Sequence, residues 1–156
     1  MYENENSPLS QKSEAFSGRV IKMVQFLNKE KDKCLKPLYN QVLRSGTSIS
    51  ANIGESQFAQ SPADFVTKLH IALKEANETR KWLNMLKSAD CLTATQFDSM
   101  NTDLSEIIAM LVSSINTSKR NQSLIIKSQT KVSVKKEEKE VTLIFHFSLF
   151  TFHLKT

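Results

Sequence analysis

Residues 61–88, SPADFVTKLHIALKEANETRKWLNMLKS, decide the fold. Ser61 is a typical helix N-cap residue, Pro62 suits the first helical position, and Asp64 favours the first turn. After this start signal, apolar residues recur every three or four positions, which is the pattern of an amphipathic helix with one buried face. The predicted core residues of this helix are Phe65, Leu69, Ala72, Ala76, Leu83 and Leu86.

Three further helices are predicted on either side of this one, over residues 13–31, residues 37–60 and a stretch from Thr95 to residue 118. Pro37 fits the first turn of its helix, and Thr95 with Asp98 repeats the capping pattern. The predicted core residues of these helices are Phe16, Val20, Met23, Val24, Leu27, Leu38, Val42, Ile49, Ile53, Phe97, Met100, Leu104, Ile107, Leu111 and Ile115.

Four amphipathic helices with short links predict an all-α fold, an antiparallel up-down-up-down four-helix bundle over residues 13–118. Residues 1–12 are expected to form a flexible N-terminus. Residues 119–156 are expected to form a non-bundle C-terminal tail, because residues 119–140 are polar and basic. Residues 141–154, VTLIFHFSLFTFHL, contain four of the nine Phe residues and have a strand-like composition. This run has three interpretations: a self-association strand, a partner-binding segment or an aggregation-prone appendage.

The positive charge is concentrated in the tail. The chain has a net charge of +5, yet residues 13–118 contain 12 Lys/Arg and 11 Asp/Glu, whereas residues 119–156 contain 8 and 3. The bundle is therefore nearly neutral, and an electrostatic argument for nucleic-acid binding depends on the tail or on local patches.

Composition and spacing indicate a cytoplasmic, non-enzymatic protein. The N-terminus has no signal-peptide pattern, and the apolar run of residues 141–154 is too short to span a bilayer, so we predict no membrane partner. Cys34 and Cys91 are far apart in sequence and are interpreted as reduced thiols. The three histidines, His70, His146 and His153, have no metal-ligand spacing, and the chain has neither a Glu-x-x-His pair nor a phosphate-binding loop. We therefore predict no catalytic residues, no metal and no cofactor.

Two predicted helices carry a second patterned face. At about 100° per residue, four residues of the second helix lie on a flank beside its apolar face, and four residues of the third helix do the same. These candidate interface residues are Arg44, Ser48, Asn52, Glu55, Ile71, Glu75, Glu78 and Trp82. Arg44 is expected to pair with Glu75 or Glu78, and Asn52 to bridge hydroxyl groups. The flank is an intramolecular network, a catalytic site or a subunit interface; the last best explains Trp82 and Ile71.

The candidate nucleic-acid contacts are the basic residues of the third helix, Lys74, Arg80, Lys81 and Lys87, together with the Lys-rich tail. Ordinary solvated helix surface is the alternative interpretation of these charges.

The stretch from Leu43 to Glu55, LRSGTSISANIGE, resembles the central motif of four-helix bundle proteins encoded in intervening sequences of bacterial 23S rRNA genes, also called S23 ribosomal proteins. The third helix agrees with this family at Asp64-Phe65, Lys68-Leu69, Ala72, Lys74-Glu75-Ala76 and Glu78–Leu83. The resemblance covers residues 13–118, with Gly54 where Ala is usual and Ser56 where Gly or Ala is usual.

The resemblance implies a homopentameric ring of bundles. It also implies a relationship to the accessory protein of diversity-generating retroelements, which binds a reverse transcriptase and nucleic acid. Our leading hypothesis is a non-catalytic, self-assembling scaffold associated with RNA or a ribonucleoprotein. The alternative is a protein–protein adaptor, such as a reverse-transcriptase accessory, that makes no nucleic-acid contact.

Overall fold

The computed structural model describes the backbone of residues 7–31 and 33–153. Within these ranges it describes the side chains up to residue 128, apart from Lys33, and the side chain of Lys139. The elements are α1 (Pro8–Glu30), a 3-10 turn η1 (Lys33–Leu35), α2 (Lys36–Ser56), α3 (Pro62–Ser88) and α4 (Ala94–His153). The chain divides into two compact units, residues 1–118 and residues 119–156. Residues 1–6 of the predicted N-terminus and residues 154–156 of the predicted tail lie outside the described residues.

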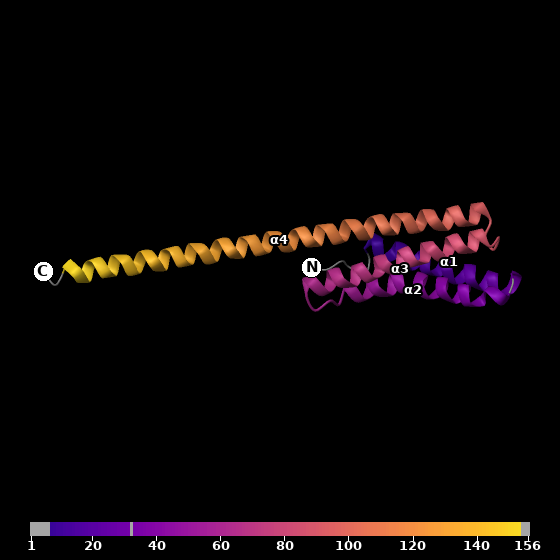
Figure 1. Cartoon of the computed structure of the whole chain (residues 1–156), viewed down its shortest axis with the longest axis horizontal. Helices are drawn as coiled ribbons and strands as arrows, with labels where there is room; N and C mark the ends of the chain where they lie inside the picture. The colour runs from indigo at the N-terminus through magenta and orange to yellow at the C-terminus, as the bar shows by residue number, and fades with distance from the viewer. Residues whose placement is uncertain (1–6, 32, 154–156) are drawn as a thin grey trace. The chain divides into compact units, whose positions relative to one another are not determined.

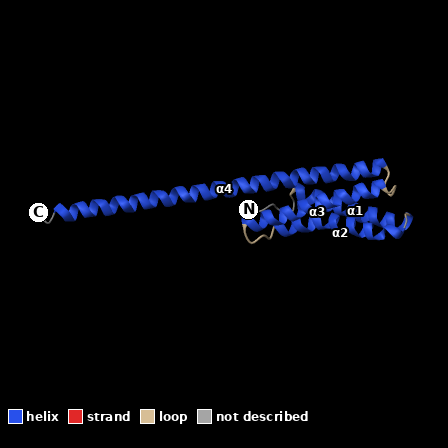
Figure 2. Ribbon diagram, in the orientation of Figure 1, coloured by secondary structure: helices blue, strands red, loops and turns tan. Residues whose placement is uncertain are grey.

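The first unit is an antiparallel four-helix bundle, which confirms the predicted fold class (Figures 1 and 2). The closest backbone approaches join α2 to α1 and α2 to α3. Side chains connect α4 to the two remaining neighbours, because Arg19 of α1 pairs with Asp103 and Arg80 of α3 donates to Ser105. The helices therefore follow one another around the bundle in chain order, and the α1/α4 face lies opposite the α2/α3 face.

The core contains most of the residues that the helical periodicity predicts. The fully or nearly fully buried ones include Phe16, Val20, Leu27, Val42, Ile49, Ile53, Leu69, Leu83, Leu104, Ile107 and Leu111. Tyr39 is also fully buried, although it was not among the predicted core residues; it lies three positions before Val42 on the same face of α2. Its hydroxyl lies 3.8 Å from the sulfur of Cys91, so a weak polar contact accompanies its burial.

α1 and α3 begin with the same Ser-Pro start signal. The Ser61 hydroxyl accepts a hydrogen bond from the Asp64 amide at 3.1 Å, as predicted. Ser7 likewise accepts from the Ser10 amide at 3.2 Å, and Pro8 occupies the first turn of α1. The prediction that the first helix begins at Ser13 is therefore wrong.

The cap of α4 differs from the predicted Thr95–Asp98 pair. The Thr93 hydroxyl accepts from the Gln96 amide at 3.2 Å, and the Gln96 side-chain oxygen accepts from the Thr93 amide at 2.9 Å. This is a reciprocal capping box, in which each side chain satisfies a backbone N–H that would otherwise lack a helical partner. Thr95 already lies inside the helix.

The second unit is helical as far as His153. Over residues 141–153, this contradicts the interpretation of the apolar run as a strand. α4 continues through this segment instead of ending at residue 118. Strand composition is only a weak preference that depends on neighbouring strands. The described residues form no strand that could pair with this segment, whereas a helix satisfies the backbone hydrogen bonds within itself.

The close approach of α1 to α2 occurs at Gly46. A Cβ atom built on Gly46 would lie 2.9 Å from both methyl groups of Val20, so a side chain does not fit without movement. Beside this contact, the Ser17 hydroxyl donates to the Gly46 carbonyl oxygen at 3.2 Å and lies 2.8 Å from the Ser50 hydroxyl. Gly46 therefore lets two helix backbones approach closely enough for short polar side chains to bridge them.

We predict that Gly46→Ala destabilises the bundle. Overpacking a core typically costs about 1–3 kcal/mol, which exceeds the gain of up to about 1 kcal/mol from replacing a helical Gly with Ala. Gly54→Ala is the matched control on the same helix, because no atom lies within 4 Å of its Cβ position. Thermal unfolding followed by circular dichroism should show a lower Tm for Gly46→Ala and an unchanged or higher Tm for Gly54→Ala. Equal Tm values for the two variants would contradict the close-packing argument.

Candidate subunit interface

The predicted flank residues meet between α2 and α3. One guanidinium nitrogen of Arg44 lies 3.1 Å from Glu75 Oε2, and the other pairs with Glu78 Oε1. The Trp82 indole N–H donates to the same Glu78 oxygen at 3.1 Å. The predicted pairing of Arg44 with these carboxylates is confirmed, and it extends to Trp82.

This cluster holds its charges at the protein surface. The Arg44 side chain is 50% exposed, whereas the Glu78 side chain is 26% exposed and the Glu75 side chain 13%. Hydrogen bonds from Arg44 and then Trp82 hold the pKa of Glu78 below its ordinary value. The hydrogen bond to Glu78 in turn raises the pKa of Arg44. Glu78 is therefore a carboxylate near neutral pH, and its Oε1 oxygen has two donors.

The other flank residues lie along the same seam. Glu55 forms an ion pair with Lys68, and Asn52 donates to the Ser48 backbone carbonyl at 2.8 Å rather than bridging hydroxyl groups as predicted. The Arg44–Glu78 and Glu55–Lys68 pairs both join α2 to α3 in their antiparallel arrangement. We call the eight predicted residues the α2/α3 stripe: Arg44, Ser48, Asn52, Glu55, Ile71, Glu75, Glu78 and Trp82.

The stripe combines satisfied polar groups with apolar surface. Trp82 is partly buried against the core, and Ile71 is 37% exposed. The polar contacts support the intramolecular interpretation, because Arg44, Glu75 and Glu78 find their partners within one chain. They also leave a pre-ordered surface on which an incoming partner has few polar groups to reorganise.

The four candidate nucleic-acid residues do not share one face of α3. Lys74 and Lys81 are exposed, seven residues apart on the outer side of the helix. Arg80 donates to Ser105 of α4 at 3.0 Å, and the Lys87 ammonium lies 4.3 Å from the centre of the Phe97 ring. At 100° per residue the two pairs lie about 120° apart. The bundle therefore presents two separated cation pairs, of which only Lys74 and Lys81 face outward.

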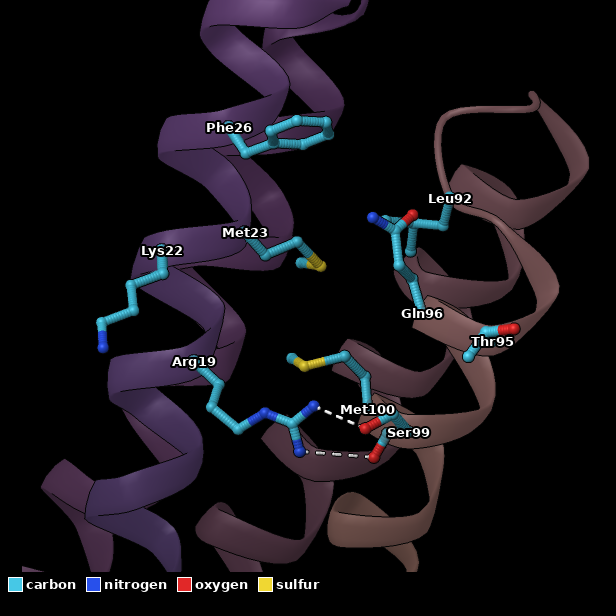
Figure 3. Close-up of a pocket in the computed structure, with 9 residues that line it drawn as sticks. All are labelled: Arg19, Lys22, Met23, Phe26, Leu92, Thr95, Gln96, Ser99 and Met100. Atoms are coloured by element: carbon cyan, nitrogen blue, oxygen red, sulfur yellow. Dashed lines mark hydrogen bonds between the residues drawn. The ribbon is translucent and has the colours of Figure 1, made fainter.

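A groove on the opposite face of the bundle was not predicted. It lies between α1 and the start of α4 and has a volume of about 490 Å³ (Figure 3). Met23, Phe26, Leu92 and Met100 provide its apolar lining, while Arg19 reaches across it to the Ser99 hydroxyl at 2.8 Å. We call it the α1/α4 groove. The available signal was the presence of Met23 and Met100 among the predicted core residues of the first and fourth helices, since flexible Met side chains often line adaptable surfaces.

Other site types receive no support from the part of the chain that the structure describes. Within it, no three His, Cys, Asp or Glu side chains form a group suited to a metal ion. No helix in that part is long and apolar enough to cross a membrane. Cys34 is exposed, Cys91 is buried, and neither forms a disulfide.

Comparison with known protein families matches residues 5–113 to the 23S rRNA-intervening sequence proteins. The chain belongs to this family. A crystal structure of a protein of unknown function from the S23 ribosomal protein family of Bacteroides thetaiotaomicron is similar, with 44% sequence identity and a TM-score of 0.65. The match covers 69% of this chain and 95% of that protein. No curated protein matches the chain. The resemblance carried by residues 43–55 is thereby confirmed at the level of the family.

The Arg44–Glu78 pair predicts a pH-dependent stability. Since the pKa of Glu78 is lower in the folded state, the pair stabilises the fold above the ordinary carboxyl value of 4.5 and is lost as the pH falls through the folded-state pKa. The contribution of such a partly exposed pair is about 1 kcal/mol or less. Urea unfolding at a series of pH values should show a shallower acid loss of stability for Glu78→Gln. Arg44→Gln should flatten the curve in the same way, and a wild-type slope in either variant would contradict this assignment.

Proposed function

We propose that this chain is a non-catalytic, self-assembling helical-bundle protein that acts as a scaffold associated with RNA or a ribonucleoprotein. The observation that carries the self-assembly is the α2/α3 stripe, where the Arg44–Glu75–Glu78 cluster orders an indole and an exposed isoleucine lies on the same seam. Trp and Arg are the residues most enriched among the dominant contacts of protein interfaces. Burying the stripe requires little rearrangement, because its charged groups already have partners.

The expected assembly is a homopentamer, the ring that the family resemblance implies. A scaffold needs stable subunit contacts, and the rigid α2/α3 register provides a surface of fixed shape for them. The chemistry of the stripe favours binding over catalysis. A general acid or base works best with a pKa near the operating pH, whereas Glu78 has a lowered pKa and is engaged by two donors.

The family description and the S23 ribosomal name of the similar protein support the association with RNA. Within this chain, Lys74 and Lys81 of α3 and Lys119, Arg120 and Lys127 of α4 are exposed cations that suit a phosphate backbone. We expect binding through these groups to be strongly salt-dependent and largely independent of base sequence.

A protein–protein adaptor, for example a reverse-transcriptase accessory, is the second candidate. The near balance of charge over residues 13–118 favours it, as does the engagement of Arg80 and Lys87 within the bundle. An adaptor would use the same self-assembled stripe without contacting nucleic acid.

The mass of the purified protein measured by light scattering tests the assembly. We expect a mass near five chains, and Trp82→Ala should lower it while the circular dichroism spectrum stays helical. Ile21→Ala is the control, because Ile21 is 42% exposed on α1, away from the stripe. A wild-type protein that is monomeric, or a Trp82→Ala variant of unchanged mass, would overturn the interface.

The ratio of absorbance at 260 and 280 nm across the same peak separates the two candidate functions. A raised ratio that falls as salt increases supports the RNA-associated scaffold. An assembly with a clean protein ratio, together with no binding to an RNA pool at low salt, would replace it with the adaptor.

A further inference from the structure

The α1/α4 groove has a largely apolar lining (Figure 3). Leu92 and Met100 are each 5% exposed, and Met23 is partly buried against the core. Phe26 is 44% exposed, so part of its ring is open to solvent. A cavity of about 490 Å³ with such a lining has the size and the character of a site for a small molecule. The groove can therefore cover the hydrocarbon part of a ligand.

The polar side chains of the groove include two cations and no carboxylate, because none of its nine lining residues is Asp or Glu. Arg19 donates to Ser99 and pairs with Asp103, so its charge is balanced and its guanidinium is held across the groove. Lys22 forms no ion pair within the part of the chain that the structure describes. The rim therefore carries an unbalanced positive charge at the Lys22 ammonium.

Gln96 adds a hydrogen-bond donor of fixed orientation. Its side-chain oxygen accepts from the Thr93 amide at 2.9 Å, as one half of the capping box of α4. Figure 3 shows the Gln96 side chain directed from α4 toward α1. Since the cap engages the oxygen, the NH₂ group of this side chain is the part that can donate to a ligand in the groove.

We propose that the α1/α4 groove binds a small carboxylate with an apolar tail, such as a medium-chain fatty acid. The tail packs against Met23, Phe26 and Met100, and the flexible Met side chains adapt to its shape. The carboxylate lies at the rim, where it is attracted by the Lys22 ammonium and accepts from the Gln96 NH₂ group. The inference goes beyond the proposed scaffold function and does not depend on the α2/α3 stripe.

Other ligands match only part of this site. A neutral apolar molecule leaves Lys22 and the Gln96 NH₂ group without a partner, and a cationic one is repelled by Lys22. A phosphate of RNA uses Lys22 but leaves the apolar lining uncovered. A second copy of the chain covers the lining but brings no excess of negative charge to the rim, because residues 13–118 contain 12 Lys/Arg and 11 Asp/Glu.

Isothermal titration calorimetry of the full-length protein with decanoate and with decylamine tests this proposal. The two compounds have the same carbon chain and opposite charge, and we expect decanoate to bind about tenfold more tightly or better. NMR of ¹³C-methyl methionine locates the site. Decanoate should shift the signals of Met23 and Met100 and leave that of Met85, which is 50% exposed on α3, unchanged. Equal affinities for the two compounds, or an equal shift at Met85, would overturn the proposal.

Gln96→Glu is the sharpest variant, because Glu preserves the capping box while it replaces the amide donor with a carboxylate. It should weaken decanoate binding by about tenfold or more, and Lys22→Gln should weaken it several-fold. Gln25→Glu and Lys74→Gln make the same charge changes at exposed positions outside the groove and should leave binding unchanged.

The apolar lining has its own matched pair of variants. Phe26→Gln should weaken decanoate binding several-fold, whereas Ile21→Gln, at a 42% exposed position of α1 outside the groove, should not. Equal effects of these two substitutions would contradict the proposed site. A wild-type protein that binds no decanoate, together with a lower mass of Phe26→Gln in light scattering, would assign the groove to a second copy instead. Trp82→Ala should retain decanoate binding when its mass falls, so failure of the proposed assembly and failure of this site are distinguishable.

Discussion

The close approach of α2 to both of its neighbours is the constraint on which the bundle depends. Gly46 has no side chain where α1 crosses, and the Ser17 hydroxyl uses the resulting proximity to reach the Gly46 carbonyl oxygen. One residue earlier, the Ser45 hydroxyl accepts from Thr79 of α3 at 2.9 Å, with both residues fully buried. Short hydroxyl side chains make such contacts only when the backbones are close, so these bonds and the missing Cβ specify the same geometry.

The fixed α2/α3 pair in turn generates the surface cluster. Arg44 precedes Ser45 on α2, and Glu75 and Glu78 precede Thr79 on α3, so the buried Ser45–Thr79 bond sets the register of the exposed ion pairs. α4 is held differently, because long side chains such as Arg19 and Arg80 reach across to it. Between α1 and the start of α4 this leaves an open space, which is the α1/α4 groove. Met23 and Met100 line it. A tight seam with an ordered surface therefore lies opposite a looser seam with an apolar groove.

Much of this was readable from the sequence, because helical periodicity and N-caps are local signals. The Ser61-Pro62 start, the core stripes and the pairing of Arg44 with acidic residues follow from spacing alone. The failures have physical causes. Thr93–Gln96 and Thr95–Asp98 have the same spacing, but only Thr93–Gln96 has the Glu or Gln that a reciprocal capping box uses, and this pair caps α4. The contact of the Tyr39 hydroxyl with Cys91 joins residues that are distant in sequence. The helical state of residues 141–153 went against their composition, since strand preference acts only where strands pair.

The same geometry accounts for three residues of the stretch from Leu43 to Glu55, which carries the resemblance to the family. Arg44, Ser45 and Gly46 are each accounted for by a contact with α1 or α3, so a packing role suffices for this part of the motif. The surfaces left for specific partners are the stripe, the groove and the second unit. A two-fold dimer uses one surface twice, whereas a closed ring needs two different surfaces on each chain. An odd number of copies, such as five, cannot form from two-fold contacts alone. The α2/α3 stripe and the α1/α4 groove are non-equivalent surfaces on opposite faces of the bundle, and whether two such surfaces give a closed ring or an open filament is set by the rotation between neighbouring copies.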